Sequence, residues 1–226
     1  NRLDVPVPPP HFDILHCARR VLKRRMKSVR LTALERRLLQ VERVGDIDGS
    51  EIPDIYFDYL HTGQPGQLLE VIRHNEWDLL AMPAIMGWLG SQYNGLDRNG
   101  HPSDWVGLAS VAERNGDTST QRRFLEAAIG QKSVRDAAAE AHLKLARLAS
   151  RSGQYSGEVE HLQAVLATGD TTFSAAAHLR LAIAYEHRLK DLAKALHHAA
   201  HCEAEEGYTA ADKRRRRLKE RLDRRT

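Results

Sequence analysis

Apolar residues recur every three or four positions along most of this chain, the spacing that places side chains on one face of an α-helix. In the first part of the chain the pattern predicts helices over residues 17–26, 28–42, 54–60 and 67–89. Pro83 lies inside the last of these and should kink it, because proline lacks an amide hydrogen and its ring clashes with the preceding turn. The chain is therefore expected to be mainly α-helical.

The exception is segment 11–15, where polar and apolar residues alternate as they do in a β-strand. A lone strand has no partner for its backbone amides and carbonyls, so this strand would need a sheet encoded elsewhere. We therefore expect residues 1–91 to be the later, mainly helical part of an α/β domain whose sheet-forming part is absent from this sequence.

A linker rich in Gly, Asn and Asp follows at 92–103, and beyond it the sequence repeats itself. Leu-Ala pairs begin at Leu108, Leu145 and Leu181, at intervals of 37 and 36 residues. Each unit has the pattern of a helix, a short turn and a second helix. A period of this length with paired helices resembles the tetratricopeptide repeat.

The turns of the repeat differ between units. Gly116 and Gly153 stand in the first two turns, whereas Leu189 is taken to replace the glycine in the third. We predict a helical repeat array over 104–208, closed by a basic helix or tail over 209–226. Such an array commonly holds a protein partner on its concave face.

The net charge of +4, from 34 basic and 30 acidic side chains, hides two clusters. Residues 19–30 contain seven basic side chains and no acid, and residues 213–225 contain nine against two acids. Each cluster carries +7, which leaves about −10 for the rest of the chain. Clusters of this kind favour a polyanionic partner such as nucleic acid, and a solvated helix face is the alternative.

An apolar content of 42% is typical of globular proteins, and the longest apolar runs fall far short of the roughly 20 residues that cross a bilayer. We therefore expect no membrane partner. Cys17 and Cys202 provide no disulfide framework, which suits a reducing, cytoplasmic location. No P-loop, H-E-x-x-H or G-x-S-x-G motif occurs, which excludes the common nucleotide-binding, zincin and serine-hydrolase sites.

The strongest candidate for chemistry is the pair His74 and Asp78 on the predicted long helix. Residues four apart project from the same helix face, so an imidazole and a carboxylate would lie about one turn from each other. Asp78 could bind Mg²⁺ or Mn²⁺ through its oxygens, while His74 accepts a proton from a water that attacks a phosphodiester. Without further context, a surface contact between the two is the simpler interpretation.

The context is a set of short motifs around this pair. His74-Asn75-x-x-Asp78 follows Gly49-Ser50-Glu51-Ile52-Pro53, Thr62-Gly63 and Leu31-x-x-x-Glu35. Together they resemble the C-terminal part of the ribonuclease-H-like exonuclease domain of bacterial proteins of the YprB group. That domain belongs to the DEDD exonuclease superfamily, and some of its members continue into tetratricopeptide-like repeats.

The resemblance implies a metal-dependent 3′–5′ exonuclease that acts on DNA or RNA, with four acids binding two Mg²⁺ or Mn²⁺ ions. Asp78 matches the last acid and His74 the proton-accepting position. The other three acids have no match, and the loop residues Asp46 and Asp48 lie too late in the fold order to supply one. This chain alone is therefore expected to be inactive. Five basic residues are expected along the phosphate track: Arg19, Arg20, Lys23, Arg24 and Arg25.

Three other readings stay open. The chain could be a non-catalytic scaffold that binds proteins through its repeats, or its basic C-terminal segment could be a separate nucleic-acid-binding arm. His197, His198, His201 and Cys202 form helix-spaced pairs that could share zinc, although each face offers too few ligands. Trp77 could stack a nucleic-acid base, but packing in the protein is the expectation we favour.

Overall fold

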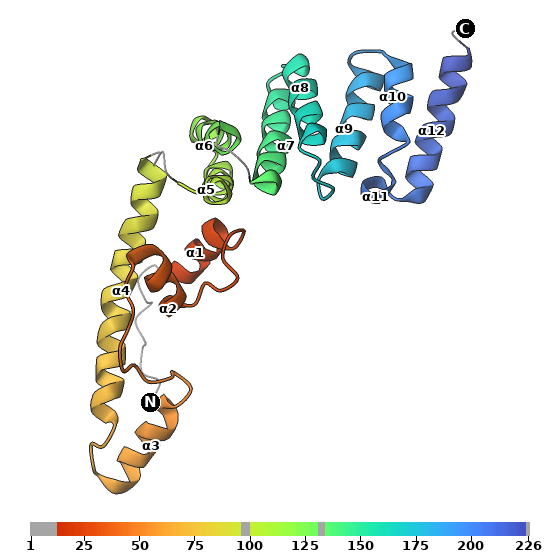
Figure 1. Cartoon of the computed structure of the whole chain (residues 1–226). Coiled ribbons are helices and arrows are strands. Elements are labelled where there is room, and N and C mark those ends of the chain that lie inside the picture. Colours follow the sequence, from red (N-terminus) through yellow and green to blue (C-terminus); the bar gives the residue numbers. More distant parts are fainter. Residues whose placement is uncertain (1–12, 96–99, 131–133, 225–226) are drawn as a thin grey trace, which may run out of the picture. The chain divides into compact units, whose positions relative to one another are not determined.

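The computed structural model of the chain describes residues 13–95, 100–130 and 134–224. The chain divides into two compact units, Asn1–Arg98 and Asn99–Thr226. Across the described residues there are twelve α-helices and one π-helical turn, η1, and no β-strand (Figure 1). The prediction of a mainly α-helical chain is confirmed for these residues.

Helix α1 (Ile14–Leu22) begins inside the segment that was predicted to be a strand. The carboxylate of Asp13 accepts a 2.8 Å hydrogen bond from the amide of Leu15, which caps one of the unpaired amides at the helix start. The strand prediction is therefore wrong for residues 14 and 15, because the cap favours a helix; residues 11 and 12 lie outside the described part of the chain.

The next predicted helix, 28–42, is shorter than expected and not wholly α-helical. Helix α2 (Leu31–Leu34) passes directly into η1 (Glu35–Leu39). The segment ends because Gln40 adopts a left-handed backbone conformation with φ of 57°. A long loop then leads to α3 (Ile52–Thr62), which ends at Gly63, also left-handed with φ of 68°.

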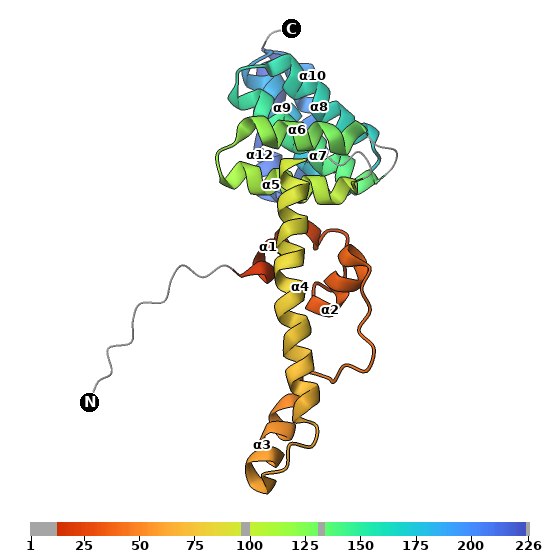
Figure 2. The same cartoon turned by 90° about the vertical axis from the view of Figure 1, so that its left-hand side faces the viewer.

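The long helix α4 (Leu68–Asn94) is the framework of the first unit, and α1, α2, η1 and α3 all pack against it (Figure 2). It continues through Pro83 without ending and extends into the predicted linker. Only Val71, Ala81 and Ile85 of this helix are buried. Many apolar side chains of α3 and α4 are instead exposed: Tyr56, Phe57, Leu60, Leu69, Ile72, Leu79 and Leu80. The first unit therefore buries little apolar surface among the described residues.

The second unit consists of helix pairs that lie side by side (Figure 1). The pairs are α5 (Pro102–Arg114) with α6 (Thr118–Gly130), α7 (Arg135–Arg151) with α8 (Tyr155–Ala167), and α9 (Ser174–His187) with α10 (Leu192–Ala199). The short α11 (Glu203–Glu206) and then α12 (Tyr208–Asp223), which packs against α10, follow. The helix–turn–helix order is as expected, and the assignment to the tetratricopeptide family stays a prediction.

The turns inside these pairs share one backbone feature. Gly116, Gly153 and Lys190 have positive φ values of 71°, 74° and 58°, and they follow one another at intervals of 37 residues. The residue that takes the place of glycine in the third turn is thus Lys190 and not Leu189. Comparison of the three turn sequences did not identify Lys190, because lysine is an uncommon residue in the left-handed backbone conformation.

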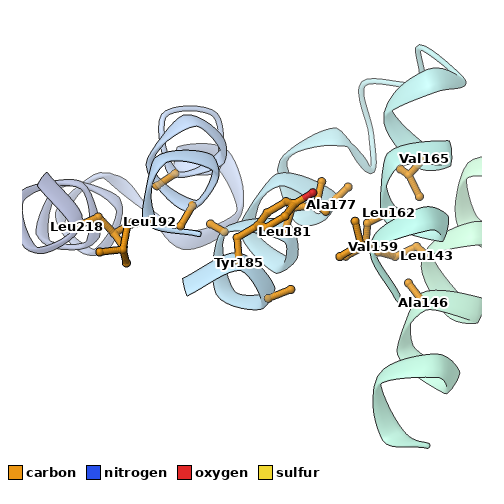
Figure 3. Close-up of a cluster of buried hydrophobic side chains, with 14 of the residues drawn as sticks. Leu143, Ala146, Val159, Leu162, Val165, Ala177, Leu181, Tyr185, Leu192 and Leu218 are labelled. Atoms are coloured by element: carbon orange, nitrogen blue, oxygen red, sulfur yellow. The ribbon is translucent and has the colours of Figure 1, made fainter. Parts of the chain in front are cut away.

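A continuous core connects α7 to α12 (Figure 3). Leu143, Leu162, Leu181 and Leu192 belong to it, and Leu218 places α12 in the same cluster. Because successive helices share this core, each pair buries its apolar side chains against its neighbours. None of the helices in the described ranges has the length and apolarity of a membrane span.

Candidate active site

His74 and Asp78 lie one turn apart on α4, as the sequence predicted. The Nε2 atom of His74 is 3.7 Å from Oδ2 of Asp78, and the two side chains are 15% and 34% exposed. This distance is too long for a direct hydrogen bond between the two groups. Solvent can therefore reach the carboxylate more easily than the imidazole.

The loop between η1 and α3 brings a second carboxylate to the imidazole. Oδ1 of Asp46 is 2.7 Å from Nδ1 of His74. Burial raises the pKa of Asp46, but hydrogen bonds from His74 and Arg43 outweigh this effect and leave the pKa below its usual value. Asp46 is thus a carboxylate that accepts a hydrogen bond from the Nδ1–H group, an arrangement in which a neutral ring has its free lone pair on Nε2.

Arg43 lies at the centre of the cluster and binds three carboxylates. Its guanidinium donates to Glu35 at 2.5 and 2.7 Å, to Asp46 at 3.1 Å and to Asp78 at 2.7 Å. The side chain is only 5% exposed. The hydrogen bond with Glu35, opposed by burial, raises its pKa above the ordinary arginine value. One guanidinium among three carboxylates leaves the cluster with an excess of negative charge.

Trp77 completes the cluster, with its ring centroid 5.6 Å from Cζ of Arg43. A guanidinium at this distance is attracted to the aromatic ring. Trp77 therefore packs against the protein's own cation. A pocket of about 450 Å³ beside it is lined mainly by apolar side chains of α4 and of the residues around Arg43.

The residues present do not form the two-metal centre that the resemblance implies. No group of three or more potential ligands among the described residues is arranged to hold a metal ion. Oδ1 of Asp78 is already bound by Arg43, which leaves Oδ2 as the oxygen available to a further cation. Asp48 is exposed and binds Ser50, so it adds no ligand to the cluster.

The predicted phosphate-track residues lie on α1 and the turn after it. Arg19 and Lys23 line a pocket of about 760 Å³ together with Lys27, Arg30 and Met82. Met82 follows Asp78 by four residues, so it lies one helical turn further along the same side of α4, a rise of about 6 Å. The basic pocket thus continues the line of His74 and Asp78. Three of the predicted residues, Arg20, Arg24 and Arg25, do not line it.

The C-terminal basic cluster is largely used inside the protein. The buried carboxylate of Glu186 binds Arg217 at 2.7 Å and Arg221 at 2.6 Å. Glu206 binds Arg214 at 2.5 Å. These ion pairs hold α12 against the preceding helices and reduce the net charge that the segment offers to a polyanion.

The histidine cluster has no arrangement for zinc within the described ranges. Nδ1 of His198 lies 3.0 Å from Nδ1 of His178 on α9. The thiol of Cys202 is buried and contacts the backbone of Ala199 and the carboxylate of Glu206. The histidine rings therefore contact one another, whereas the partners of the thiol are the backbone of Ala199 and the side chain of Glu206.

Sequence reasoning missed three residues of the site: Glu35, Arg43 and Asp46. Glu35 was noted only as part of a motif, and Asp46 was set aside because of its position in the fold order. Arg43 carries no motif at all. Arg43 could have been identified from its neighbours in the sequence, because an arginine with acids on both sides in a long loop is a candidate for a shared ion pair.

The chain is similar to an uncharacterized protein named YprB from Bacillus subtilis (strain 168), with 29% identity over 189 residues. The alignment covers 82% of this chain and 45% of the relative, so the chain spans about half of that protein's length. The 189 aligned residues exceed the length of the first unit, so the similarity extends into the second unit. No solved structure gave a significant match. Residues 1–90 match the model of a family described as the RNase_H superfamily, and the unit that carries His74 and Asp78 is thus similar to that superfamily.

Proposed function

We propose that the first unit is part of a metal-dependent nuclease that hydrolyses phosphodiesters of DNA or RNA, with the 3′–5′ direction that the family resemblance implies. The observation that carries the proposal is the arrangement of Asp46, His74 and Asp78 on one side of α4. The match of residues 1–90 to the RNase_H superfamily supports it.

His74 is the proton acceptor in this proposal. The carboxylate of Asp46 accepts a hydrogen bond from the Nδ1–H group and holds the ring, which leaves Nε2 free to take a proton from an attacking water. The same logic of a carboxylate that fixes the tautomer of a base operates in other hydrolases. The 15% exposure of the side chain leaves room for approach from solvent.

With the missing acids in place, Asp78 would supply one metal ligand through Oδ2. Enzymes of the RNase H superfamily usually use divalent metals such as Mg²⁺ or Mn²⁺, which stabilise the charge that develops on the phosphate. The other acids of the family pattern are not among the described residues, so the proposal requires them from the rest of the gene product. The basic side chains of the pocket that Met82 also lines would suit the phosphates on the 5′ side of the scissile bond.

In this proposal the second unit binds a partner of the nuclease. Its helix pairs fit tetratricopeptide-like repeats, which would position the nucleic acid or hold a protein. The alternative function is a non-catalytic scaffold. One observation favours it: Arg43 occupies the carboxylate of Asp78, and no metal-ligand group is present in the described ranges.

The test uses the complete gene product and a 3′-labelled single-stranded oligonucleotide with Mg²⁺ or Mn²⁺. Asp78→Asn keeps an oxygen that can accept from Arg43, so the fold should persist while digestion falls by about 100-fold or more. His74→Asn keeps a donor near the Nδ1 position for Asp46 and removes the base, with a smaller expected loss of about 10- to 100-fold.

Asp58→Asn is the matched control, since this exposed aspartate on α3 lies outside the cluster. It should digest like the wild type. Unchanged digestion by Asp78→Asn at an unchanged melting temperature would remove Asp78 from the mechanism. A wild-type protein with no metal-dependent digestion would support the scaffold.

A further inference from the structure

The second unit contains a pocket whose composition indicates a ligand. Its volume is about 410 Å³, and α7, α8 and α9 together with the residue that ends α9 form it. It is lined by Arg147, Ser150, Arg151, Glu158, Arg180, Ile183 and Arg188. Four arginines against one glutamate give this pocket an excess positive charge of three.

The single acid is already shared by two of the arginines. Glu158 is 2% exposed, and its carboxylate binds Arg180 at 2.7 Å and also binds Arg188. A small residue is usual at this place in tetratricopeptide repeats, and a buried glutamate there is unexpected. Its role in the structure is to hold two guanidinium groups at the wall of the pocket.

The other two arginines have no acid of their own. Arg147 and Arg151 lie four residues apart on α7, are exposed, and form no ion pair with any described residue. The acid that feels their charge is Glu113, but its carboxylate is bound by Lys144 at 2.9 Å. Two uncompensated cations thus point to an anion from outside the chain.

A hydrogen-bond donor in the same pocket also lacks a partner. Nε of Arg180 is the one buried side-chain nitrogen or oxygen, among the described residues, that has no hydrogen-bond partner. A buried unpaired donor is energetically costly, and for that reason such groups are uncommon in proteins. The unpaired Nε marks Arg180 as a guanidinium whose donors are not all used within the described part of the chain.

An aromatic side chain beside the pocket distinguishes between kinds of anion. Tyr155 at the start of α8 is 41% exposed, and its ring centroid is 4.6 Å from Cζ of Arg188. Basic side chains with an exposed aromatic ring are the combination that binds single-stranded nucleic acid, because the cations contact phosphates and the ring stacks on a base. An acidic peptide would use the arginines but not the ring.

We propose that this pocket binds a backbone phosphate of single-stranded nucleic acid, with Arg147 and Arg151 as the principal contacts and Tyr155 as a platform for an adjoining base. The proposal rests on the proposed function for its choice of nucleic acid as ligand. The pocket itself is independent of the metal chemistry of the first unit.

The experiment measures binding of a fluorescent 12-nucleotide single-stranded oligonucleotide to the full chain in EDTA, which prevents metal-dependent digestion. Arg147→Gln combined with Arg151→Gln should weaken the affinity by about tenfold at 0.1 M salt and reduce the salt slope by one to two. Tyr155→Leu should weaken single-strand binding by about fivefold and leave duplex binding unchanged.

The matched control is Lys190→Gln with Lys194→Gln, which removes the same charge from two exposed positions outside both basic clusters. It should change the affinity less than threefold. An equal loss in the control, or no loss in the arginine double variant, would overturn the proposal. Tighter binding of a polyglutamate peptide that depends on Arg147 and Arg151 would instead identify a protein ligand.

This experiment separates the two proposals. Binding is measured in EDTA, so its result does not depend on nuclease activity. If Asp78→Asn retains digestion, the proposed function fails but the binding result for the pocket still stands. Conversely, loss of digestion in Asp78→Asn with unchanged binding by the arginine double variant would reject only the pocket. Circular dichroism of each variant checks that the helices are intact.

Discussion

Arg43 connects three parts of the first unit, because it binds a carboxylate from η1, one from the following loop and one from α4. Glu35 is itself 3% exposed, so its charge is tolerated in the interior only because the guanidinium pairs with it in a bidentate contact. The unit has a small apolar core among its described residues, which increases its dependence on this cluster.

Replacement of Arg43 by Met should therefore destabilise the first unit by about 3–5 kcal/mol, since it leaves Glu35 buried and unpaired. Urea unfolding, followed by the fluorescence of Trp77 and Trp88, measures the change. Arg73→Met is the control, because Arg73 is exposed and makes only a 3.4 Å surface pair with Glu70.

A second variant tests the cause of that loss. Glu35→Leu added to Arg43→Met removes the buried charge together with its partner, so much of the stability should return. A single Arg43→Met variant that stays within about 1 kcal/mol of the wild type would contradict the structural role of the ion pair.

Lys190 is a residue whose backbone conformation is suited to glycine. Its φ of 58° is strained for a side chain with a Cβ atom, and the equivalent turns use Gly116 and Gly153. Lys190→Gly should therefore stabilise the second unit by about 0.5–1 kcal/mol, measured as a rise in melting temperature.

Gly153→Ala tests the opposite change, the introduction of a Cβ atom at a left-handed turn position. Nothing lies within 4 Å of an added Cβ at this position, so backbone strain alone should lower stability by a similar amount. A fall in stability with Lys190→Gly would show that the lysine side chain contributes more than its backbone costs.

At the level of helices, pairs of histidines join neighbouring elements in the second unit. His142 on α7 contacts His161 on α8, and His178 on α9 contacts His198 on α10, with Nδ1 atoms 3.2 and 3.0 Å apart. The two contacts join successive helix pairs, with the corresponding histidines 36 and 37 residues apart in the sequence. One ring of each pair must be neutral at the contacting nitrogen to accept the hydrogen bond.

These contacts make the stability of the second unit depend on pH. Burial, followed by the charge of His178, lowers the pKa of His198 to about 4. The charges of His197 on α10 and of His201, which follows that helix, also act on it. The ring of Tyr185 stacks on it, with Lys194 over the Tyr185 ring. Because the folded pKa lies below the ordinary value, the unfolded chain binds the proton first, and stability present above pH 6.5 is lost as the pH falls towards 4.

The prediction is a loss of about 1 kcal/mol for His198 after allowance for its partial exposure, between pH 6.5 and 4. Urea unfolding followed by the fluorescence of the buried Trp105 measures it at several pH values. A His178→Gln/His198→Gln variant should show a flatter pH dependence, and His187→Gln, at an exposed position, should not. Equal slopes for all three proteins would exclude this histidine pair as the cause.

Across the whole molecule, the two units differ in how they are stabilised. The second has a continuous apolar core from α7 to α12, whereas the first combines few buried apolar side chains with exposed ones on α3 and α4. The similarity to a longer protein, of which the alignment covers 45%, fits with a first unit that has further contacts in a complete gene product.

The sequence by itself determined most of the helices and the spacing of His74 and Asp78, because both depend on the local repeat of an α-helix. It did not determine the start of α1. The alternation of five residues favours a strand only weakly, and the hydrogen bond that the Asp13 carboxylate accepts at the helix start stabilises the helix instead. It also assigned the wrong residue to the third turn, because only the backbone angle distinguishes Lys190 from Leu189.

The tertiary structure alone decided the composition of the candidate site. Arg43 and Asp78 are 35 positions apart, and His74 and Asp46 are 28 apart, so no local pattern could join them. The same holds for Glu158 with Arg180 and Arg188, which meet only because α8 and α9 pack together. Helical periodicity is encoded within a few residues, whereas the partners of a buried charge depend on the path of the whole chain.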